Sequence, residues 1–370
     1  MNSLLRWPEP IVRVQSLSES GISLIPEKYI KSLSDRPTTY FSSFSSLPPT
    51  TIEDEAAINI PIIDLSDLFS GDPSLRHATL RLIDCACREW GFFQVVNHGV
   101  SQQLMSRIRE AWRQFFHLPL DEKQAYANSP LTYEGYGSQL GVEKGIKLDW
   151  SDYFFLHYLP TSLRDQNKWP KFPPFCRKLV ADYGDELAKL SGKLMKAFST
   201  NLGLDEDYLD KAFGGDQSGA CLRVNFYPKC PQPDLTLGLS PHSDPGGMTL
   251  LLPDDNVSGL QVRRGDEWIT VKPVPNAFIV NIGDQIQVLS NATYKSVEHR
   301  VIVNEAKERV SLAFFYNPDG NTMIKPAKEL VTEDKPTLYP PITFNDYRLF
   351  IRRKGPAGKS QVESLKLPPV

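Results

Sequence analysis

Two histidines and an aspartate have the residue types and the spacing of a mononuclear metal site. His242 and Asp244 stand two positions apart in the segment 239–244 (LSPHSD), and His299 follows 55 residues after Asp244. Side chains at positions i and i+2 of an extended segment project to the same side of the chain. Two imidazoles and one carboxylate on one face of an octahedron leave three positions open, as in non-haem Fe(II) oxygenases. We therefore predict that His242, Asp244 and His299 bind Fe(II) and form the catalytic centre.

The His-x-Asp pattern also occurs by chance, and a zinc hydrolase can use two histidines and one carboxylate as well. The chain has six histidines, and the four others lack a comparable partner. Among these, His98 lies in a predicted turn, where we expect a structural role. An independent signal is needed to choose between the two metals.

An arginine on an apolar strand supplies this signal. Arg309 stands ten residues after His299 and begins the segment 309–316 (RVSLAFFY), in which alternation puts Arg309 and Ser311 on one face. A buried, unpaired charge is costly, so an inward arginine needs an anion. A dicarboxylate such as 2-oxoglutarate fits, since one end can chelate iron while the other forms a forked ion pair with Arg309, assisted by the Ser311 hydroxyl. The alternative is an internal salt bridge of Arg309 with Glu298 or Glu308.

These candidates lie in a region that is rich in short predicted strands. From residue 221 onward, turn residues separate β-rich segments at 221–227, 248–252, 259–263, 267–271, 277–281, 286–289, 297–303 and 309–316. Short strands in such a series are typical of a jelly roll or a barrel.

Helices are predicted on both sides of this β-rich region. The apolar spacing predicts helices over 75–90, 101–117, 174–202 and 343–353, with short strands at 60–65 and 92–96. We expect one α+β unit in which the helical half supports the sheet. Residues 35–57 are rich in Ser, Thr and Pro and predict an exposed, poorly ordered link. The predicted organisation is an N-terminal arm and link (1–57), a helical N-terminal region (58–215), a jelly-roll core (216–320) and a C-terminal helix and tail (321–370).

The composition excludes several classes of function. The 370 residues are 41% hydrophobic and 23% charged, as in ordinary globular proteins, and the net charge of −3 gives no attraction to nucleic acid or acidic membranes. No apolar run approaches the roughly 20 residues that span a bilayer, and the start lacks the features of a secretory signal. Five scattered cysteines indicate reduced thiols. We expect a cytoplasmic protein, with the nucleus as an alternative, that acts on a small molecule as a monomer or weak homodimer.

The motifs together resemble those of the plant 2-oxoglutarate-dependent dioxygenases. The resemblance lies in His242-x-Asp244 with the distal His299, in Arg309-x-Ser311 and in 225–231 (NFYPKCP). It extends to 91–99 (GFFQVVNHG) and covers most of residues 58–355. It implies a distorted double-stranded β-helix that binds Fe(II), 2-oxoglutarate and O₂, with ascorbate in support. The residues that it implies for 2-oxoglutarate are Arg309, Ser311, Tyr227 and Asn225.

Within this family, the chain resembles in particular the jasmonate-induced oxygenases, which hydroxylate jasmonic acid. The segments that carry this resemblance are 7–15 (WPEPIVRVQ), 133–137 (YEGYG), 148–153 (LDWSDY) and 347–352 (YRLFIR). The resemblance implies conversion of jasmonic acid to 12-hydroxyjasmonic acid with release of succinate and CO₂. Such a reaction would lower the pool of hormone precursor and dampen defence signalling.

A substrate carboxylate would need cations of its own. Arg348 and Arg352 are spaced i, i+4 on the predicted C-terminal helix and share one face, while Arg223 lies on the inward face of the strand 221–227. We hypothesise that these three arginines bind the carboxylate at the pocket mouth and that Phe155 and Phe315 form an apolar wall. The alternatives are a solvated helix face for the two helical arginines and ordinary core packing for the phenylalanines.

Other functions are weighed against this one. The same chemistry could act on a flavonoid or a gibberellin, but a neutral flavonoid would leave the three arginines without an anion. A catalytically silent ligand-binding protein on the same scaffold is an alternative of another class. A dinucleotide-binding enzyme is excluded, because Gly135-x-Gly137-x-x-x-Gly141 is one residue too long for the fingerprint and lacks its strand–turn–helix context.

Overall fold

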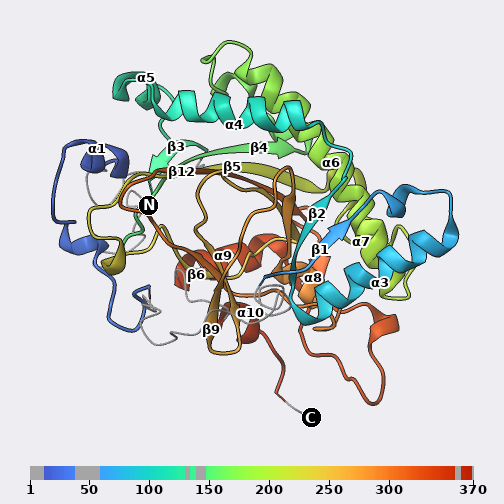
Figure 1. The fold of residues 1–370 in the computed structure, drawn as a ribbon. Helices are drawn as coiled ribbons and strands as arrows, with labels where there is room; N and C mark the ends of the chain where they lie inside the picture. The colour runs from blue at the N-terminus through green and yellow to red at the C-terminus, as the bar shows by residue number, and fades with distance from the viewer. Residues whose placement is uncertain (1–11, 38–58, 130–133, 139–146, 355–359, 369–370) are drawn as a thin grey trace, which may run out of the picture.

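The computed structural model describes residues 12–37, 59–129, 134–138, 147–354 and 360–368, without the side chains of 352–354 and 360. Within these ranges, a larger and a smaller β-sheet face each other (Figure 1), and residues from both line a central pocket. The larger sheet has the strand order β1 (Ile62–Asp64), β2 (Phe92–Val96), β10 (Phe278–Ile282), β7 (Met248–Leu252), β12 (Arg309–Asn317), β5 (Gly219–Tyr227), β4 (Asp152–Leu159) and β3 (Gly135–Ser138). The smaller sheet has the order β6 (Leu239–His242), β11 (His299–Val301), β8 (Leu260–Arg264) and β9 (Glu267–Thr270).

Helices cover the outer face of the larger sheet (Figure 1). They are α3 (Pro73–Glu89), α4 (Gln102–Phe116) and α6 (Cys176–Asn201). Helix α4 begins where the Ser101 hydroxyl accepts a hydrogen bond from the N–H of Leu104, and its buried side chains recur at helical spacing. Its Trp112 packs with a ring-centroid distance of 5.0 Å against Phe154 of β4, and Phe116 stacks at 4.7 Å on Phe226 of β5. The main core therefore lies between these helices and the sheet.

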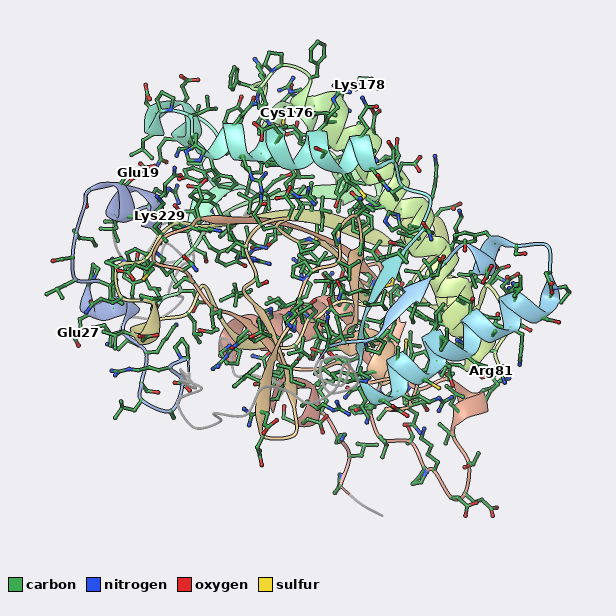
Figure 2. All side chains as sticks on the ribbon, in the orientation of Figure 1. Glu19, Glu27, Arg81, Cys176, Lys178 and Lys229 are labelled. Atoms are coloured by element: carbon green, nitrogen blue, oxygen red, sulfur yellow. The ribbon has the colours of Figure 1, made fainter. Side chains whose placement is uncertain are left out.

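Helices α3 and α6 expose charged side chains on the side away from the sheet. Figure 2 shows Arg81 on α3 and Lys178 on α6 at the periphery, and both are exposed, whereas Cys176 at the start of α6 is buried. No helix in the described ranges has the length and apolar character required to cross a bilayer.

Shorter elements complete the structure. They are α1 (Val14–Glu19), α5 (Leu120–Gln124), α7 (Tyr208–Ala212), α8 (Asp284–Leu289), α9 (Phe344–Lys354), α10 (Ser360–Glu363), β13 (Met323–Ile324) and β14 (Ile342–Thr343). Short 3-10 turns are η2 (Glu27–Tyr29), η3 (Asp67–Phe69), η4 (Thr161–Leu163), η5 (Gln166–Lys168), η6 (Gly215–Gln217), η7 (Pro233–Leu235) and η8 (Lys328–Leu330). Strands β13 and β14 pair with each other.

The described part of the N-terminal arm, residues 12–37, packs on the body of the protein. Val14 and Tyr29 belong to a second buried cluster that includes Trp150, and the rings of Tyr29 and Trp150 meet edge-on at 5.1 Å. The buried carboxylate of Asp152 in β4 accepts hydrogen bonds from the N–H groups of Val14 (3.0 Å) and Gln15 (2.9 Å). It thereby satisfies two donors of the first turn of α1, which have no partner within the helix.

Comparison with the expected elements gives one wrong prediction. Residues 286–289 were predicted as a strand but form part of α8, in which every residue is buried. A short apolar run has the same composition in a buried strand and in a buried helix, so its periodicity does not distinguish them. Strand β3 was not predicted, β6 lies within the segment 239–244 that was expected to be extended, and the larger sheet crosses the predicted boundary at residue 216. Most of the predicted link, 35–57, lies outside the described residues.

The carboxylate of Asp152 is expected to hold the arm in place. Replacing Asp152 by alanine leaves the N–H groups of Val14 and Gln15 without their acceptor, and each unsatisfied buried donor costs about 1–3 kcal/mol. We expect the free energy of unfolding, measured by urea denaturation, to fall by about 2 kcal/mol or more. The control is Asp182→Ala, which removes only a half-exposed ion pair with Lys178. Equal stability of the two variants would contradict this role of Asp152.

Candidate active site

Three candidate metal ligands meet at one point of the pocket. The ligand atoms of His242, Asp244 and His299 all lie within 4.8 Å of one another. The Oδ1 atom of Asp244 is 3.6 Å from the Nε2 atom of each histidine. His242 ends β6 and His299 begins β11, and antiparallel pairing puts these two residues directly opposite each other. The pairing of β6 with β11 thus brings together two histidines that are far apart in the sequence.

Backbone carbonyls orient both imidazoles. The Nδ1 atom of His242 lies 2.8 Å from the carbonyl oxygen of Ser240, and the Nδ1 atom of His299 lies 3.2 Å from that of Val297. A carbonyl oxygen can only accept, so each Nδ1 carries a hydrogen, and in the neutral imidazole Nε2 keeps its lone pair. Both lone pairs belong to the atoms that approach Asp244, as in metal sites where a second partner fixes the histidine tautomer.

The carboxylate of Asp244 is held in one orientation by two donors. Its Oδ2 atom accepts hydrogen bonds from the Thr249 hydroxyl (2.5 Å) and from the Asn281 amide (2.7 Å), which leaves Oδ1 toward the histidines. Thr249 in β7 and Asn281 in β10 are cross-strand partners. Neither residue was predicted from the sequence, although each is a polar position in an otherwise apolar strand.

The protonation states suit a metal ion. Burial would raise the pKa of Asp244, but the two histidines and the Asn281 hydrogen bond hold it well below its usual range. Burial, assisted by the nearby His242, lowers the pKa of His299 to about 4. An anionic carboxylate and a neutral imidazole are the forms that bind metal ions. Burial would lower the pKa of His242, but the Asp244 carboxylate raises it above its usual value, and a bound metal ion would displace that proton. Two imidazole nitrogens and one carboxylate oxygen with open positions fit Fe(II).

Arg309 is a buried cation on the same pocket wall. Its side chain is 4% exposed, and it donates to the Ser311 hydroxyl at 3.3 Å and lies 5.1 Å from the ring centre of Tyr227. Its Nε atom has no hydrogen-bond partner among the described residues. Among these residues, Arg309 forms no salt bridge with Glu298 or Glu308, the two alternatives considered above. Glu308 pairs instead with His117 at 2.7 Å. An anion from outside the chain would complete this site.

Strand pairing assembles the other candidate residues around Arg309. Strands β12 and β5 pair so that Arg309 stands opposite Tyr227 and Ser311 opposite Asn225. All four side chains line the pocket, which has a volume of about 780 Å³. The Asn225 amide oxygen accepts a hydrogen bond from Arg223 at 2.8 Å, so part of its bonding capacity is already used.

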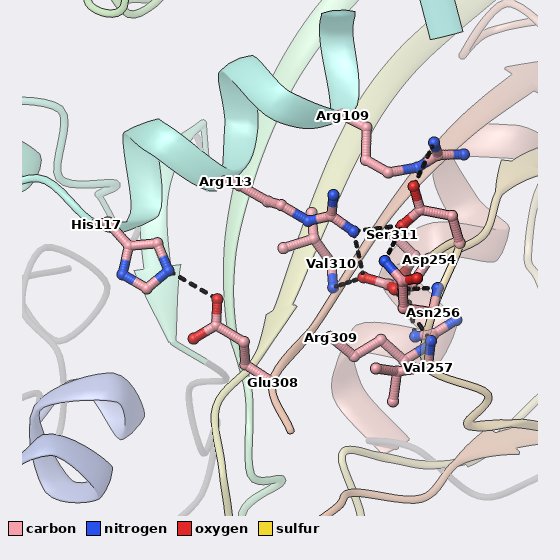
Figure 3. Close-up of polar contacts among 11 residues, drawn as sticks. Arg109, Arg113, His117, Asp254, Asn256, Val257, Glu308, Arg309, Val310 and Ser311 are labelled. Carbon is pink, nitrogen blue, oxygen red and sulfur yellow. Dashed lines mark hydrogen bonds and ion pairs between the residues drawn. The ribbon is translucent and has the colours of Figure 1, made fainter. Parts of the chain in front are cut away.

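A buried carboxylate fixes the start of β12 (Figure 3). Asp254 is 2% exposed, and its Oδ2 atom accepts hydrogen bonds from the N–H of Val310 (3.0 Å) and from Arg113 of α4 (3.2 Å). Its Oδ1 atom accepts from the N–H groups of Asn256 and Val257. Val310 lies between Arg309 and Ser311, so Asp254 ties the strand that carries both residues to helix α4. This role of Asp254 was not predicted from the sequence.

Four of the candidate substrate residues line the same pocket. Arg223, Phe155, Phe315 and Arg348 all contribute to its wall. The guanidinium of Arg223 lies 4.3 Å from the ring centre of Tyr153. The side chain of Arg352 lies outside the described residues, so its predicted role is not tested.

Two sequence features have structural roles. The ring of His98 accepts from the N–H of Val100 at 3.1 Å through Nδ1, and its Nε2 atom lies 3.0 Å from the carbonyl oxygen of Asn276, as expected for a turn. Gly135 and Gly137 lie in strand β3 and not in a strand–turn–helix loop.

The fold and the site define a non-haem iron oxygenase. Residues 218–318 match the 2OG-Fe(II) oxygenase superfamily, and residues 60–172 match the N-terminal family described as non-haem dioxygenase in morphine synthesis. The chain belongs to the 2OG-Fe(II) oxygenase superfamily and is an Fe(II)- and 2-oxoglutarate-dependent dioxygenase. The predicted family, α+β jelly-roll fold and cofactors are thereby confirmed.

Its relatives narrow this class. Jasmonate-induced oxygenase 2 of Arabidopsis thaliana is 64% identical over 363 residues, which cover 98% of this chain and 95% of the relative. Jasmonate-induced oxygenase 1 of the same plant is 62% identical over 362 residues, covering 97% and 87%. A crystal structure of JOX2 in complex with 2OG, Fe and JA has a TM-score of 0.88 at 62% identity, covering 98% of this chain and all of that one.

The hydrogen bond between Asp254 and the N–H of Val310 in β12 is expected to support binding of 2-oxoglutarate. In Asp254→Ala, the N–H of Val310 loses its acceptor and the neighbouring Arg309 loses its fixed backbone. We expect KM for 2-oxoglutarate to rise roughly tenfold, in line with the cost of one buried hydrogen bond. The control is Asp255→Ala, which removes ion pairs with Arg113 and Arg109 but no bond to β12. An unchanged KM in Asp254→Ala would refute this positioning role.

Proposed function

We propose that the protein hydroxylates jasmonic acid to 12-hydroxyjasmonic acid, consuming O₂ and 2-oxoglutarate and releasing succinate and CO₂. The observation that carries the proposal is that two further cations, Arg223 and Arg348, lie on the wall of the pocket that also contains Arg309. One arginine can serve the co-substrate while the others serve an acidic substrate. The names of the related jasmonate-induced oxygenases and the JA in the JOX2 complex point to the same acid. The reaction would down-regulate jasmonate signalling.

Three side chains are assigned to the iron. His242, Asp244 and His299 would hold Fe(II), which together with 2-oxoglutarate supplies the activation of O₂ for insertion of oxygen into an unactivated C–H bond. The protein contributes orientation and a pocket shielded from water. Thr249 and Asn281 keep the Asp244 carboxylate in its ligating orientation.

Four side chains are assigned to 2-oxoglutarate. Arg309 and Ser311 would bind its distal carboxylate, with Tyr227 and Asn225 beside them. Burial raises the pKa of Tyr227, so its phenol stays protonated and can donate a hydrogen bond to a carboxylate.

The substrate carboxylate is assigned to Arg223, Arg348 and Arg352. Arg223 stands opposite Ala313, four residues along β12 from Arg309. At about 3.4 Å per residue, the two arginine positions are roughly 14 Å apart along the sheet, which separates the two anions. Arg223 is already held by its bond to Asn225. Phe155, the cross-strand partner of Arg223 in β4, and Phe315 would contact the hydrocarbon part of the substrate.

Product analysis tests the proposed reaction. The protein is incubated in air with Fe(II), 2-oxoglutarate, ascorbate and, separately, jasmonic acid, a gibberellin or a flavonoid. We expect succinate release with jasmonic acid and a product heavier by one oxygen atom, placed at carbon 12 by fragmentation in the mass spectrometer. Turnover of the flavonoid or gibberellin alone would refute the proposed substrate. No succinate with any of them would favour a silent binding protein.

Removal of a substrate arginine tests the carboxylate assignment. We expect Arg348→Ala to raise KM for jasmonic acid roughly tenfold or more, since a charge-assisted hydrogen bond is lost, and to leave KM for 2-oxoglutarate unchanged. The control is the methyl ester of jasmonic acid, which has no carboxylate for Arg348 to bind. Equal losses for the acid and the ester would show that Arg348 acts through packing and not through charge.

A further inference from the structure

A buried lysine of the N-terminal arm is connected to a candidate iron ligand by a chain of hydrogen bonds. Lys31 is 5% exposed, and its ammonium donates to the Asp149 carboxylate at 2.6 Å and to the Ser240 hydroxyl at 2.9 Å. The carbonyl oxygen of the same Ser240 accepts the Nδ1 hydrogen of His242 at 2.8 Å. The arm thus reaches His242 through one intervening residue.

The donors and acceptors of this group fit together without conflict. The Ser240 hydroxyl accepts from Lys31 and donates to Oδ1 of Asp149 at 2.5 Å, while the Ser240 N–H donates to Oδ2 at 2.9 Å. Asp149, which is 1% exposed, therefore accepts hydrogen bonds from both the side chain and the backbone of Ser240. Fixing this residue fixes the carbonyl that orients the His242 ring, because both belong to β6.

Lys31 supplies the charge that this carboxylate needs. A buried carboxylate without a counter-ion is strongly destabilising, and Lys31 forms the ion pair with Asp149 that the structure contains. Backbone bonds on both sides set the position of Lys31. The backbone N–H of Lys31 donates to the carbonyl oxygen of Leu235 at 2.9 Å. The backbone N–H of Leu148 donates to the carbonyl oxygen of Lys28 at 2.7 Å. The arm is therefore in register with the segments that precede β4 and β6.

We propose that Lys31 is a positioning residue for the iron site: through Asp149 and Ser240 it holds His242 with Nε2 toward Asp244. The arm is then part of the metal site and not only a covering segment. This inference rests on the proposed role of His242 as a ligand. Partners that orient a metal-binding histidine commonly change metal affinity by about 10–100-fold when they are removed.

The chain offers a matched control for a purely structural role of the arm. Lys123 is 3% exposed, and its ammonium donates to the Gln15 amide oxygen and to the carbonyl oxygen of Phe116, both at 2.7 Å. It is also a buried lysine that fixes the arm, but none of its hydrogen bonds leads to a candidate iron ligand. Loss of Lys123 should loosen the arm and leave the geometry of His242 intact.

Metal affinity of the full-length, metal-free protein separates the two roles. Lys31→Met and Lys123→Met are titrated with Fe(II) without oxygen in a calorimeter, and their melting temperatures without metal are measured. We expect both to melt below the wild type, and Lys31→Met alone to bind Fe(II) about tenfold more weakly. Equal affinities of Lys31→Met and the wild type would overturn the proposal, as would equal losses in Lys31→Met and Lys123→Met.

Two further variants keep the test decisive. Ser240→Ala removes only the hydroxyl and serves if Lys31→Met does not fold; it should weaken Fe(II) binding in the same direction, and an unchanged affinity would contradict the proposal. His242→Ala tests the ligand role itself and should abolish tight binding. Retained tight binding in His242→Ala would refute the ligand assignment, whereas loss there with no effect in Lys31→Met or Ser240→Ala would refute only the positioning role.

Discussion

The approach of one buried carboxylate to two imidazoles is the interaction on which the rest of the structure depends. Asp244 is 5% exposed, and an ionised carboxylate at such a site is stable only if charges and hydrogen bonds replace its water. Thr249 and Asn281 occupy one of its oxygens, and the two histidines face the other. These five residues come from four separate segments of the chain. The strands of each sheet must therefore pair in their observed register to bring them together.

The charged groups around the pocket fall into two kinds. Asp254 and Asp149 are buried carboxylates whose partners are all supplied by the chain, and both stabilise a backbone segment next to a candidate functional residue. Arg309 is a buried cation for which the described residues supply no carboxylate. Complete partners indicate a positioning role, whereas an incomplete set on a pocket wall indicates a ligand. The guanidinium of Arg113 is paired with Asp254, whereas that of Arg309 lies on the pocket wall without a carboxylate among the described residues.

The sequence was sufficient for features that depend on local spacing. The alternation of Arg309 with Ser311 follows from strand geometry, so their common face could be predicted without coordinates. The i, i+2 spacing of His242 and Asp244 correctly suggested one site, although β6 ends at His242 and Asp244 follows the strand. Long-range partners could not be predicted in this way. The contacts of Asp254 with Val310 and of Lys31 with Asp149 depend on the register of segments that lie far apart in the chain. The buried run 286–289 was assigned wrongly because its composition suits a strand and a helix equally.

The central claim is that a single iron ion and the Arg309 guanidinium together form the binding site for 2-oxoglutarate. Calorimetric titration of the metal-free protein with 2-oxoglutarate, before and after saturation with Fe(II) under anaerobic conditions, tests it most directly. The account predicts tight binding of one 2-oxoglutarate per chain only after iron is bound, and a large loss of affinity in Arg309→Ala. Equally tight binding without iron, or binding that Arg309→Ala leaves unchanged, would contradict it.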